Sequence, residues 1–256
     1  MYFVLVENCN INKENNVNMD YKDYQAGQTA DNFWFRAKYG LIRLLMEKNS
    51  KNKSGEPLKI LSIGTGTGDD LKILKSFGNN YVTDILPEAL AIVPDEDCFE
   101  KQMADACALP YEEGFFDIVV SFDVFEHIEQ DKKAVSEVYR VLKKGGSLVY
   151  SVPAGPGLFS SHDIALEHYR RYNKKMVKEL FSSFDEVKTY SWNTLLYPLI
   201  AFSRIKNKNR PPSVDHPKLP GFVDTLFYYL LCFDNFLIKR GFSLPLGISI
   251  TGWCKK

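Results

Sequence analysis

Apolar and polar residues follow two different periods along the chain, and the two periods alternate. Short apolar runs predict β-strands at residues 58–63, 81–83, 102–104, 116–122 and 147–152. Amphipathic patterns between the runs predict helices, and the clearest lies at 130–143, where one stripe contains Ala134, Val135, Val138, Val141 and Leu142. Strands that alternate with helices are typical of βαβ units, so the sequence predicts an α/β fold with a mostly parallel sheet.

The chain on either side of this region is less regular. Ahead of it, residues 7–20 predict an exposed leader, and a helix is expected to start at Asp31 as N-cap and to end before a loop at 47–55. Behind it, we expect a loop at 154–163, a helix at 174–184 and strands at 186–192 and 248–253. These patterns divide the chain into an N-terminal segment, 1–57, and a main domain, 58–256, with a helical insertion at 195–246.

The insertion contains the most apolar segment of the chain. Thirteen of the seventeen residues at 222–238 are apolar, but Asp224 and Asp234 interrupt them. This segment is too short and too charged for a bilayer span, so two core helices are the simplest expectation. A cover over an apolar acceptor, and peripheral membrane or dimer contact through 195–240, are the alternatives.

Composition excludes several function classes. The 32 Lys and Arg residues cancel the 32 Asp and Glu residues, which argues against a protein that mainly grips nucleic acid by its phosphates. The five cysteines are scattered without a C-x-x-C pair, so we expect no metal and no disulfides, but free thiols in the cytoplasm. They are Cys9, Cys98, Cys107, Cys232 and Cys254. The N-terminus lacks the basic and long apolar regions of a signal peptide.

The strongest chemical signal is a glycine loop. Residues 60–70 read ILSIGTGTGDD, in which a strand runs into Gly64, Gly66 and Gly68. A dinucleotide site prefers G-x-G-x-x-G, whose third glycine falls at position 69, but this chain has Asp69 there. Acidic side chains at a helix start repel a pyrophosphate. The loop therefore favours a ligand without phosphates that carries an amino-acid end and a nucleoside.

Two acidic residues extend this interpretation. Asp84 ends the second predicted strand, twenty residues after Gly64, where a carboxylate accepts both ribose hydroxyls. Asp105, followed by Ala106, ends the third predicted strand and has the chemistry to accept from an adenine amino group. Either aspartate alone is equally typical of a turn or a helix cap. Together, the three strand ends predict a nucleoside site.

These stretches resemble the class I S-adenosylmethionine-dependent methyltransferases, close to the type 11 methyltransferase domain. The resemblance rests on LSIGTGTG, YVTDILPEAL, ADACALPYEEGFFDIVVSFDVFEHI and EVYRVLKKGGSLVYSVPA, within residues 58–152, with weaker similarity on both flanks. It implies S-adenosylmethionine as cofactor. It also implies a Rossmann-like, seven-stranded, mostly parallel sheet with helices on both faces, an antiparallel last strand at 248–253 and a helical insertion before it.

The resemblance assigns cofactor contacts by position. It implies that Gly64, Thr65, Gly66 and Gly68 contact the methionine part of the cofactor and that Phe122 lies beside the methionine amine. It implies that Asp84 binds the ribose and that Ile85, Asp105 and Ala106 contact the adenine. In similar enzymes the segment ahead of the sheet is a lid, here with Tyr21, Tyr24, Phe33 and Trp34, and Arg36 is expected to reach a carboxylate. One position departs from the family: Ser62 stands where an acid is usual, two residues before the first glycine.

Candidate catalytic residues follow the fourth and fifth strands. His127 lies just past the fourth strand and is the expected general base, with a structural histidine as the alternative. His162, His168, Arg171 and Tyr172 follow the fifth strand, where they are expected to contact the acceptor.

The sequence thus predicts a methyltransferase that acts on a small-molecule, glycan or lipid acceptor. A catalytically inactive cofactor-binding module is the alternative, with Ser62 as its positive sign, and an RNA or protein methyltransferase is a further one. A DNA acceptor is not expected, because residues 121–124 read SFDV instead of the Asn/Asp-Pro-Pro-aromatic element of DNA amino-methyltransferases. A dehydrogenase is disfavoured by Asp69.

Overall fold

The computed structural model describes residues 32–50, 55–208, 211 and 219–256. A seven-stranded sheet forms its centre, in the order β3-β2-β1-β4-β5-β7-β6. The strands are β1 (Leu58–Ile63), β2 (Gly78–Asp84), β3 (Glu100–Met103), β4 (Phe116–Phe122), β5 (Leu142–Pro153), β6 (Glu186–Trp192) and β7 (Ser249–Lys255). Strands β1 to β5 pair in parallel, whereas β7 runs antiparallel between β5 and β6. The expected mostly parallel sheet with an antiparallel last strand is confirmed.

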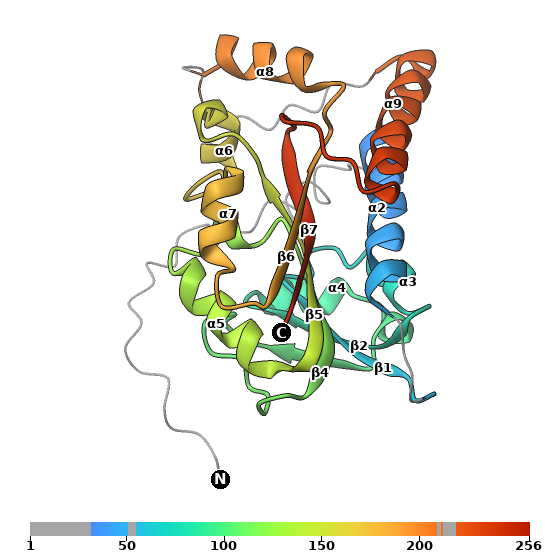
Figure 1. Cartoon of the computed structure of the whole chain (residues 1–256), viewed down its shortest axis with the longest axis vertical. Coiled ribbons are helices and arrows are strands. Elements are labelled where there is room, and N and C mark those ends of the chain that lie inside the picture. Colours follow the sequence, from blue (N-terminus) through green and yellow to red (C-terminus); the bar gives the residue numbers. More distant parts are fainter. Residues whose placement is uncertain (1–31, 51–54, 209–210, 212–218) are drawn as a thin grey trace.

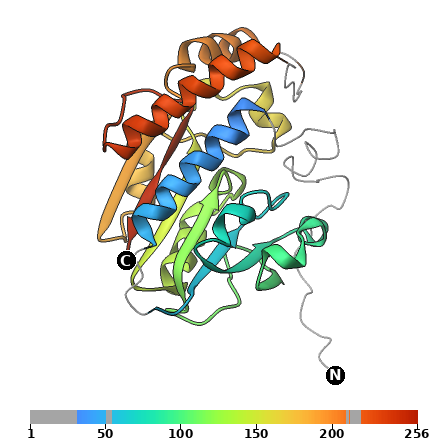
Figure 2. The same ribbon diagram turned by 90° about the vertical axis from the view of Figure 1, so that its right-hand side faces the viewer.

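Helices cover both faces of the sheet (Figures 1 and 2). They are α2 (Phe33–Asn49), α3 (Leu71–Leu74), α4 (Pro87–Ile92), α5 (Asp131–Val141), α6 (Ser161–Ala165), α7 (Lys174–Leu180), α8 (Tyr197–Lys206) and α9 (Gly221–Lys239), with 3-10 turns η1 (Asp95–Asp97), η2 (Phe125–His127) and η3 (Pro156–Leu158). One apolar core joins α5 and α7 to the sheet, and a second joins α2, α3 and α9 to its other face. The period-3.6 stripe predicted at 130–143 is the buried face of α5.

Several predicted boundaries are corrected. Asn32, not Asp31, caps α2, because its side chain accepts hydrogen bonds from the backbone N–H groups of Trp34 and Phe35. Helix α5 ends at Val141, two residues before the end of its predicted range at 143, because Leu142 already has extended backbone. The loop expected at 154–163 contains η3 and the start of α6. The helix expected at 174–184 ends earlier, at Leu180.

Helix α2 is a packed part of the fold. Its apolar face, with Leu41 and Leu45 almost fully buried, belongs to the same core as α9 and the sheet. Phe33 packs edge to face on Phe227 of α9, at 5.4 Å between ring centroids. This part of the predicted lid is therefore a core element, while Tyr21 and Tyr24 lie outside the described residues.

Helix α9 is longer than the sequence pattern predicted. It runs over 19 residues, and in the described part of the chain it is the one helix whose length and composition would allow it to cross a membrane. Only 17% of its apolar window is buried. The expectation that this segment is too short to span is corrected. The expectation of a core helix holds for one face only, because one face packs on the protein and the other is exposed.

Candidate functional site

The glycine loop makes a tight turn at the carboxyl end of β1. Gly64, Gly66 and Gly68 have φ of +63°, +54° and +73°, a region that favours glycine. The backbone N–H of Gly64 donates to the carbonyl of Thr83 at 2.8 Å, which ties the loop to β2. A Cβ on Gly64 would lie 2.7 Å from a methyl of Val124. The sequence therefore needs glycine here for both backbone conformation and close packing.

Asp84 lies beside this loop at the end of β2. Its side chain is buried, and its two oxygens accept from the backbone N–H groups of Leu86 at 2.9 Å and Gly66 at 3.2 Å. Burial raises the pKa of this carboxyl, although the backbone hydrogen bonds oppose that shift. The neighbouring Ile85 is 58% exposed, as suits an apolar side chain available to a ligand. The predicted ribose and adenine positions are thus adjacent to the glycine loop.

The end of β3 lies next to the end of β2. Residue Ala104 donates its backbone N–H to the carbonyl of Asp84 at 3.0 Å. Asp105 is exposed and accepts from the backbone N–H of Cys107 at 2.7 Å, while Ala106 is buried. Because β1, β2 and β3 are adjacent parallel strands, their carboxyl ends meet at one edge. The structure therefore brings the three predicted strand ends together.

Asp123, directly after β4, was missed by the sequence reasoning. It has φ of +57°, which is uncommon for a residue other than glycine. One carboxylate oxygen accepts from Lys38 Nζ at 2.7 Å and the other from Ser151 Oγ at 3.0 Å. Burial works to raise the pKa of Asp123, but the Lys38 ammonium and the Ser151 hydroxyl outweigh it and lower the pKa. A charged pair thus lies beside Phe122, the residue predicted to contact the methionine amine.

Arg36 is directed elsewhere. Its guanidinium pairs with Asp224 of α9 and lies over the Tyr228 ring at 4.5 Å. Lys38 comes two residues after Arg36, and residues two apart in an α-helix lie about 200° apart around its axis. Lys38 is therefore on another side of α2, where it reaches Asp123. The structure does not favour the predicted role of Arg36 and places the Lys38 cation near the strand ends.

His127 lies in η2 with its ring edge to face on His168, at 4.6 Å between centroids. Burial and the neighbouring His168 lower the pKa of His127 to about 4, although Asp123 opposes this shift. At neutral pH the His127 imidazole is therefore uncharged, the state that a general base needs. The structure thus brings the two predicted histidines into one group.

His168 is itself held by Asp163, whose carboxylate oxygen lies 3.1 Å from His168 Nδ1. Asp163 is fully buried, and its carboxylate also pairs with Arg171 at 2.8 Å and Arg204 at 3.4 Å. Burial opposes ionisation of Asp163, but His168 and the two arginines outweigh it and hold the pKa well below its usual range. Asp163 orients His168 from inside the protein.

Arg171 and Tyr172 serve this interior rather than an open pocket. Arg171 donates to the carbonyls of Ala154 at 2.8 Å and Ile248 at 3.2 Å, in addition to its bond with Asp163. The hydroxyl of Tyr172 donates to the carboxylate of Asp131 at 2.9 Å, and the Tyr172 side chain is 1% exposed. The predicted acceptor contact of these two residues is not favoured. His162 is half-buried on α6.

One group among the described residues has the donor set and spacing for a metal ion. It comprises Glu126, His127 and His168, whose ligand atoms all lie within 4.8 Å of one another. Two imidazoles and a carboxylate suit a divalent transition metal. The sequence led us to expect no metal, because only cysteine spacing was considered; Glu126 and His127 are adjacent, but His168 is 41 positions away from His127.

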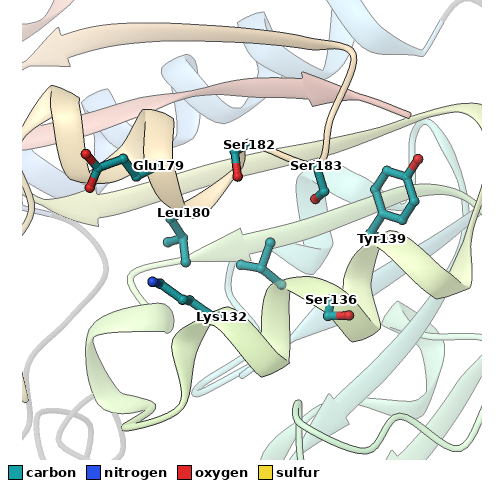
Figure 3. A pocket seen from close by; sticks show the side chains of 8 residues that line it. Lys132, Ser136, Tyr139, Glu179, Leu180, Ser182 and Ser183 are labelled. Carbon is teal, nitrogen blue, oxygen red and sulfur yellow. The ribbon is translucent and has the colours of Figure 1, made fainter.

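A separate hollow of about 280 Å³ opens between α5 and α7 (Figure 3). It is lined by Lys132, Val135, Ser136, Tyr139, Glu179, Leu180, Ser182 and Ser183. No residue of the predicted cofactor or acceptor site lines this hollow. It belongs to the helix packing on that face of the sheet and not to the glycine loop.

Known proteins resemble this chain in sequence and in fold. Residues 61–150 match a family model described as a methyltransferase domain. A demethylmenaquinone methyltransferase of Thermus thermophilus is 40% identical over 101 residues, 36% of this chain and 46% of that protein. A malonyl-acyl-carrier-protein O-methyltransferase of a Paenibacillus species is 29% identical over 144 residues, 52% of this chain and 51% of that protein. The chain spans about half the length of the curated relatives it matches.

The structural similarity extends further along the chain. A Haloferax volcanii methyltransferase, solved in complex with the Trm112 activator, has a TM-score of 0.56 at 18% identity and covers 93% of both chains. That similarity supports the fold over nearly the whole length. Domains of this family and fold generally use S-adenosylmethionine. The chain thus contains a methyltransferase domain at residues 61–150, and its strand order and fold are those of the class I S-adenosylmethionine-dependent methyltransferases.

Proposed function

We propose that the protein transfers a methyl group from S-adenosylmethionine to a small-molecule, glycan or lipid acceptor by direct displacement. The observation that carries the proposal is the meeting of three strand ends: the positive-φ glycine loop after β1, the buried Asp84 after β2, and Asp105 with Ala106 after β3. Each supplies a group that one part of the cofactor needs. By their names, the relatives described above methylate demethylmenaquinone and malonyl-acyl-carrier protein, which supports a small-molecule acceptor.

The residues present fit the cofactor. The three glycines place no side chain over the end of β1, and Asp84 keeps a carboxylate directly beside that turn. Ile85 would lie against the adenine, with Asp105 and Ala106 at its edge. The ion pair of Lys38 and Asp123 would place an ammonium and a carboxylate close to the methionine end of the cofactor. When bound, the cofactor supplies a methyl group on a positively charged sulfur, an excellent leaving group.

The protein then has two tasks, alignment and proton removal. Alignment of the two reactants contributes much of the rate in such displacements. An acceptor O–H or N–H must also lose a proton, and the uncharged His127 imidazole is the group we assign to take it. Asp163 would keep the neighbouring His168 ring in place through Nδ1 while His127 acts.

Calorimetric titration with S-adenosylmethionine and its demethylated product tests the proposal, with NAD as the comparison ligand. We expect micromolar binding of the first two and none of NAD. Loss of charged hydrogen bonds to the ribose should weaken binding in Asp84→Ala by roughly 10- to 100-fold. Glu88→Ala, on the exposed start of α4, is the matched control and should bind as the native chain does. A folded protein that binds neither nucleoside would contradict the proposal.

A further inference from the structure

Exposed apolar side chains gather on two helices of the insertion. Large hydrophobic side chains of α8 and α9 are half to three-quarters exposed, which is unusual for a soluble surface. We call this surface the α8–α9 apolar face and define it by Leu199, Phe202 and Ile205 of α8 and Phe222, Leu226 and Phe233 of α9. Both helices lie at the same end of the molecule, at the top of Figures 1 and 2. On each helix the exposed side chains recur at helical spacing, so each helix presents one apolar stripe.

The orientation of α9 is fixed by polar contacts on its opposite side. Asp234 is buried and accepts from the backbone N–H of Thr194 at 2.6 Å. Asn235 accepts from the indole N–H of Trp192 at 2.9 Å and donates to the carbonyl of Ala37 at 2.9 Å. Since these contacts hold one side of α9 against the sheet and α2, the helix cannot turn its apolar side inward.

Among the described residues of 195–246, the charged residues that are exposed all have one sign. In the described part of 195–246, the carboxylates are Asp224, which pairs with Arg36, and the buried Asp234. The exposed charged residues there are cations: Lys206, Lys208, Lys239 and Arg240. The whole chain has a net charge of zero, so this surface is locally basic. An apolar surface bordered by cations complements a bilayer with anionic lipid headgroups.

We propose that the α8–α9 apolar face docks the protein on the surface of an anionic lipid bilayer. The helices lie in the interface with their apolar side chains among the acyl chains and their cations at the headgroups. Helix α9 lies on the bilayer and does not cross it, because Asp234 and Asn235 bond to the rest of the fold. A second copy of the chain is a poorer occupant, since a symmetric contact would bring the same cations together. The docking does not depend on the methyl transfer proposed above.

Sedimentation with lipid vesicles tests the docking on the full chain. The probes are vesicles of phosphatidylcholine alone and vesicles with 30% phosphatidylserine. We expect the native protein to pellet with the anionic vesicles and to bind the neutral ones more weakly. Raising the salt concentration should reduce this preference, because it screens the lysines. A carbonate wash should release the protein, as it releases proteins that only lie on the surface.

Two surface variants separate the contributions. Phe202→Ser with Phe222→Ser removes exposed rings, so it should weaken vesicle binding at least tenfold without unfolding the protein. Phe99→Ser is the matched control: Phe99 is 62% exposed, close to the 67% of Phe202, but lies before β3. It should pellet as the native chain does. Lys206→Gln with Lys208→Gln should reduce binding to anionic vesicles only, by about fivefold for each lysine.

Three outcomes overturn the docking. They are a native protein that stays in solution with both kinds of vesicle, a Phe202→Ser, Phe222→Ser double variant that pellets as the native chain does, and a native dimer in ultracentrifugation that the double variant converts to monomer. Retention after the carbonate wash would replace docking with a membrane span. Cofactor affinity, measured by the titration described above, is independent of all four results, so failure of one proposal does not imply failure of the other.

Discussion

At the scale of single residues, two cationic side chains of α2 form ion pairs in different places. Lys38, whose side chain is 15% exposed, pairs with Asp123 near the strand ends, whereas Arg36, whose side chain is 41% exposed, pairs with Asp224. We therefore predict that Lys38→Ala weakens S-adenosylmethionine binding by about tenfold, because Asp123 loses the cation that compensates its charge. Arg36→Ala should leave the affinity unchanged and cost less than about 1 kcal/mol of stability, as exposed pairs do. Calorimetry and urea unfolding measure both.

The opposite result for the two variants would support the predicted contact of Arg36 with the cofactor carboxylate. If Arg36→Ala weakens binding and Lys38→Ala does not, the ion pair with Asp224 must open in the bound state. Asp224→Ala separates the two cases: it should not affect affinity if Arg36 only packs, and it should raise affinity if Arg36 has to be released.

His127 makes a prediction about pH. Its pKa is about 4 in the folded chain, lowered first by burial and then by His168, against about 6.5 in an unfolded chain. Between these values the unfolded state binds the extra proton, so the free energy of unfolding should fall as the pH drops from about 6.5 to 4. Above pH 6.5 this contribution is fully present. His127→Gln should make the stability less dependent on pH in that window.

Nuclear magnetic resonance titration of the imidazole signals tests this directly. The His127 ring should remain uncharged at pH 5, and its signal is the one absent from His127→Gln. A midpoint near 6.5 would show that the ring is solvated. If His127 is the base, kcat/KM should show no loss from protonation of this ring between pH 8 and 5, whereas an unshifted histidine would lose about thirtyfold at pH 5.

The site residues differ in how local their signal is. The strand-end positions of the glycines and Asp84 were predictable because the apolar patterns of β1 and β2 are visible in the sequence, whereas β3, which precedes Asp105 and Ala106, has few apolar residues. Lys38 and Asp123 were missed because their contact joins positions 85 residues apart and depends on the side of α2 that faces the sheet. Asp163 did carry a signal: Ser160-x-x-Asp163 is a capping box, which indicates a structural helix start.

At the scale of elements, the loop after β1 depends on Gly64. Alanine there would require φ of +63° and would bring its Cβ to 2.7 Å from Val124. We predict that Gly64→Ala lowers the free energy of unfolding by about 1–3 kcal/mol and weakens cofactor binding. Adding Val124→Ala should relieve the clash but not the backbone strain, so recovery should be partial. Thermal unfolding and calorimetry measure the two effects.

Gly157 offers the matched control for this substitution. A Cβ at Gly157 meets nothing within 4 Å, and Gly157 has no positive φ. Gly157→Ala should therefore leave both stability and affinity nearly unchanged. Equal effects of the two substitutions would show that the loop tolerates a side chain at Gly64.

The type of an element was predictable where its apolar period is regular. The ends of an element were predictable where a capping or turn residue marks them. The β4 strand matches its predicted range because its buried, β-branched run begins just after Gly114. Strand β3 has an exposed surface and few apolar residues, so its start was misplaced. Helix α9 was underestimated because its two aspartates appeared to interrupt it, whereas Asp224 and Asp234 are bonded to Arg36 and Thr194.

At the scale of the whole molecule, Asp163 connects distant parts of the chain. Through Arg171 it is linked to the carbonyls of Ala154 after β5 and Ile248 before β7, and through Arg204 to α8. The same carboxylate holds His168 beside His127. One buried charge thus joins the insertion, the last strand and the candidate catalytic group.

This arrangement predicts how the protein responds to loss of that charge. Asp163→Asn leaves Arg171 and Arg204 without their anion in the interior, which should lower the free energy of unfolding at pH 7 by about 3–5 kcal/mol. The folded pKa of Asp163 lies below the unfolded value of about 3.9, so its stabilisation is present above pH 4 and lost as the pH falls below it. The native chain and Asp163→Asn should therefore converge in stability in acid.

Urea unfolding of both chains from pH 7 to pH 3 measures this difference, with Asp95→Asn as the control. Asp95 also forms an ion pair, with Lys101, but its side chain is 96% exposed, so its removal should change little. Equal unfolding midpoints for the native chain and Asp163→Asn at pH 7 would mean that the arginines find other partners. The difference should be smaller at pH 3, because the unfolded native chain takes up a proton on Asp163 there, whereas the asparagine has none to bind. A difference that persists unchanged at pH 3 would assign the effect to packing.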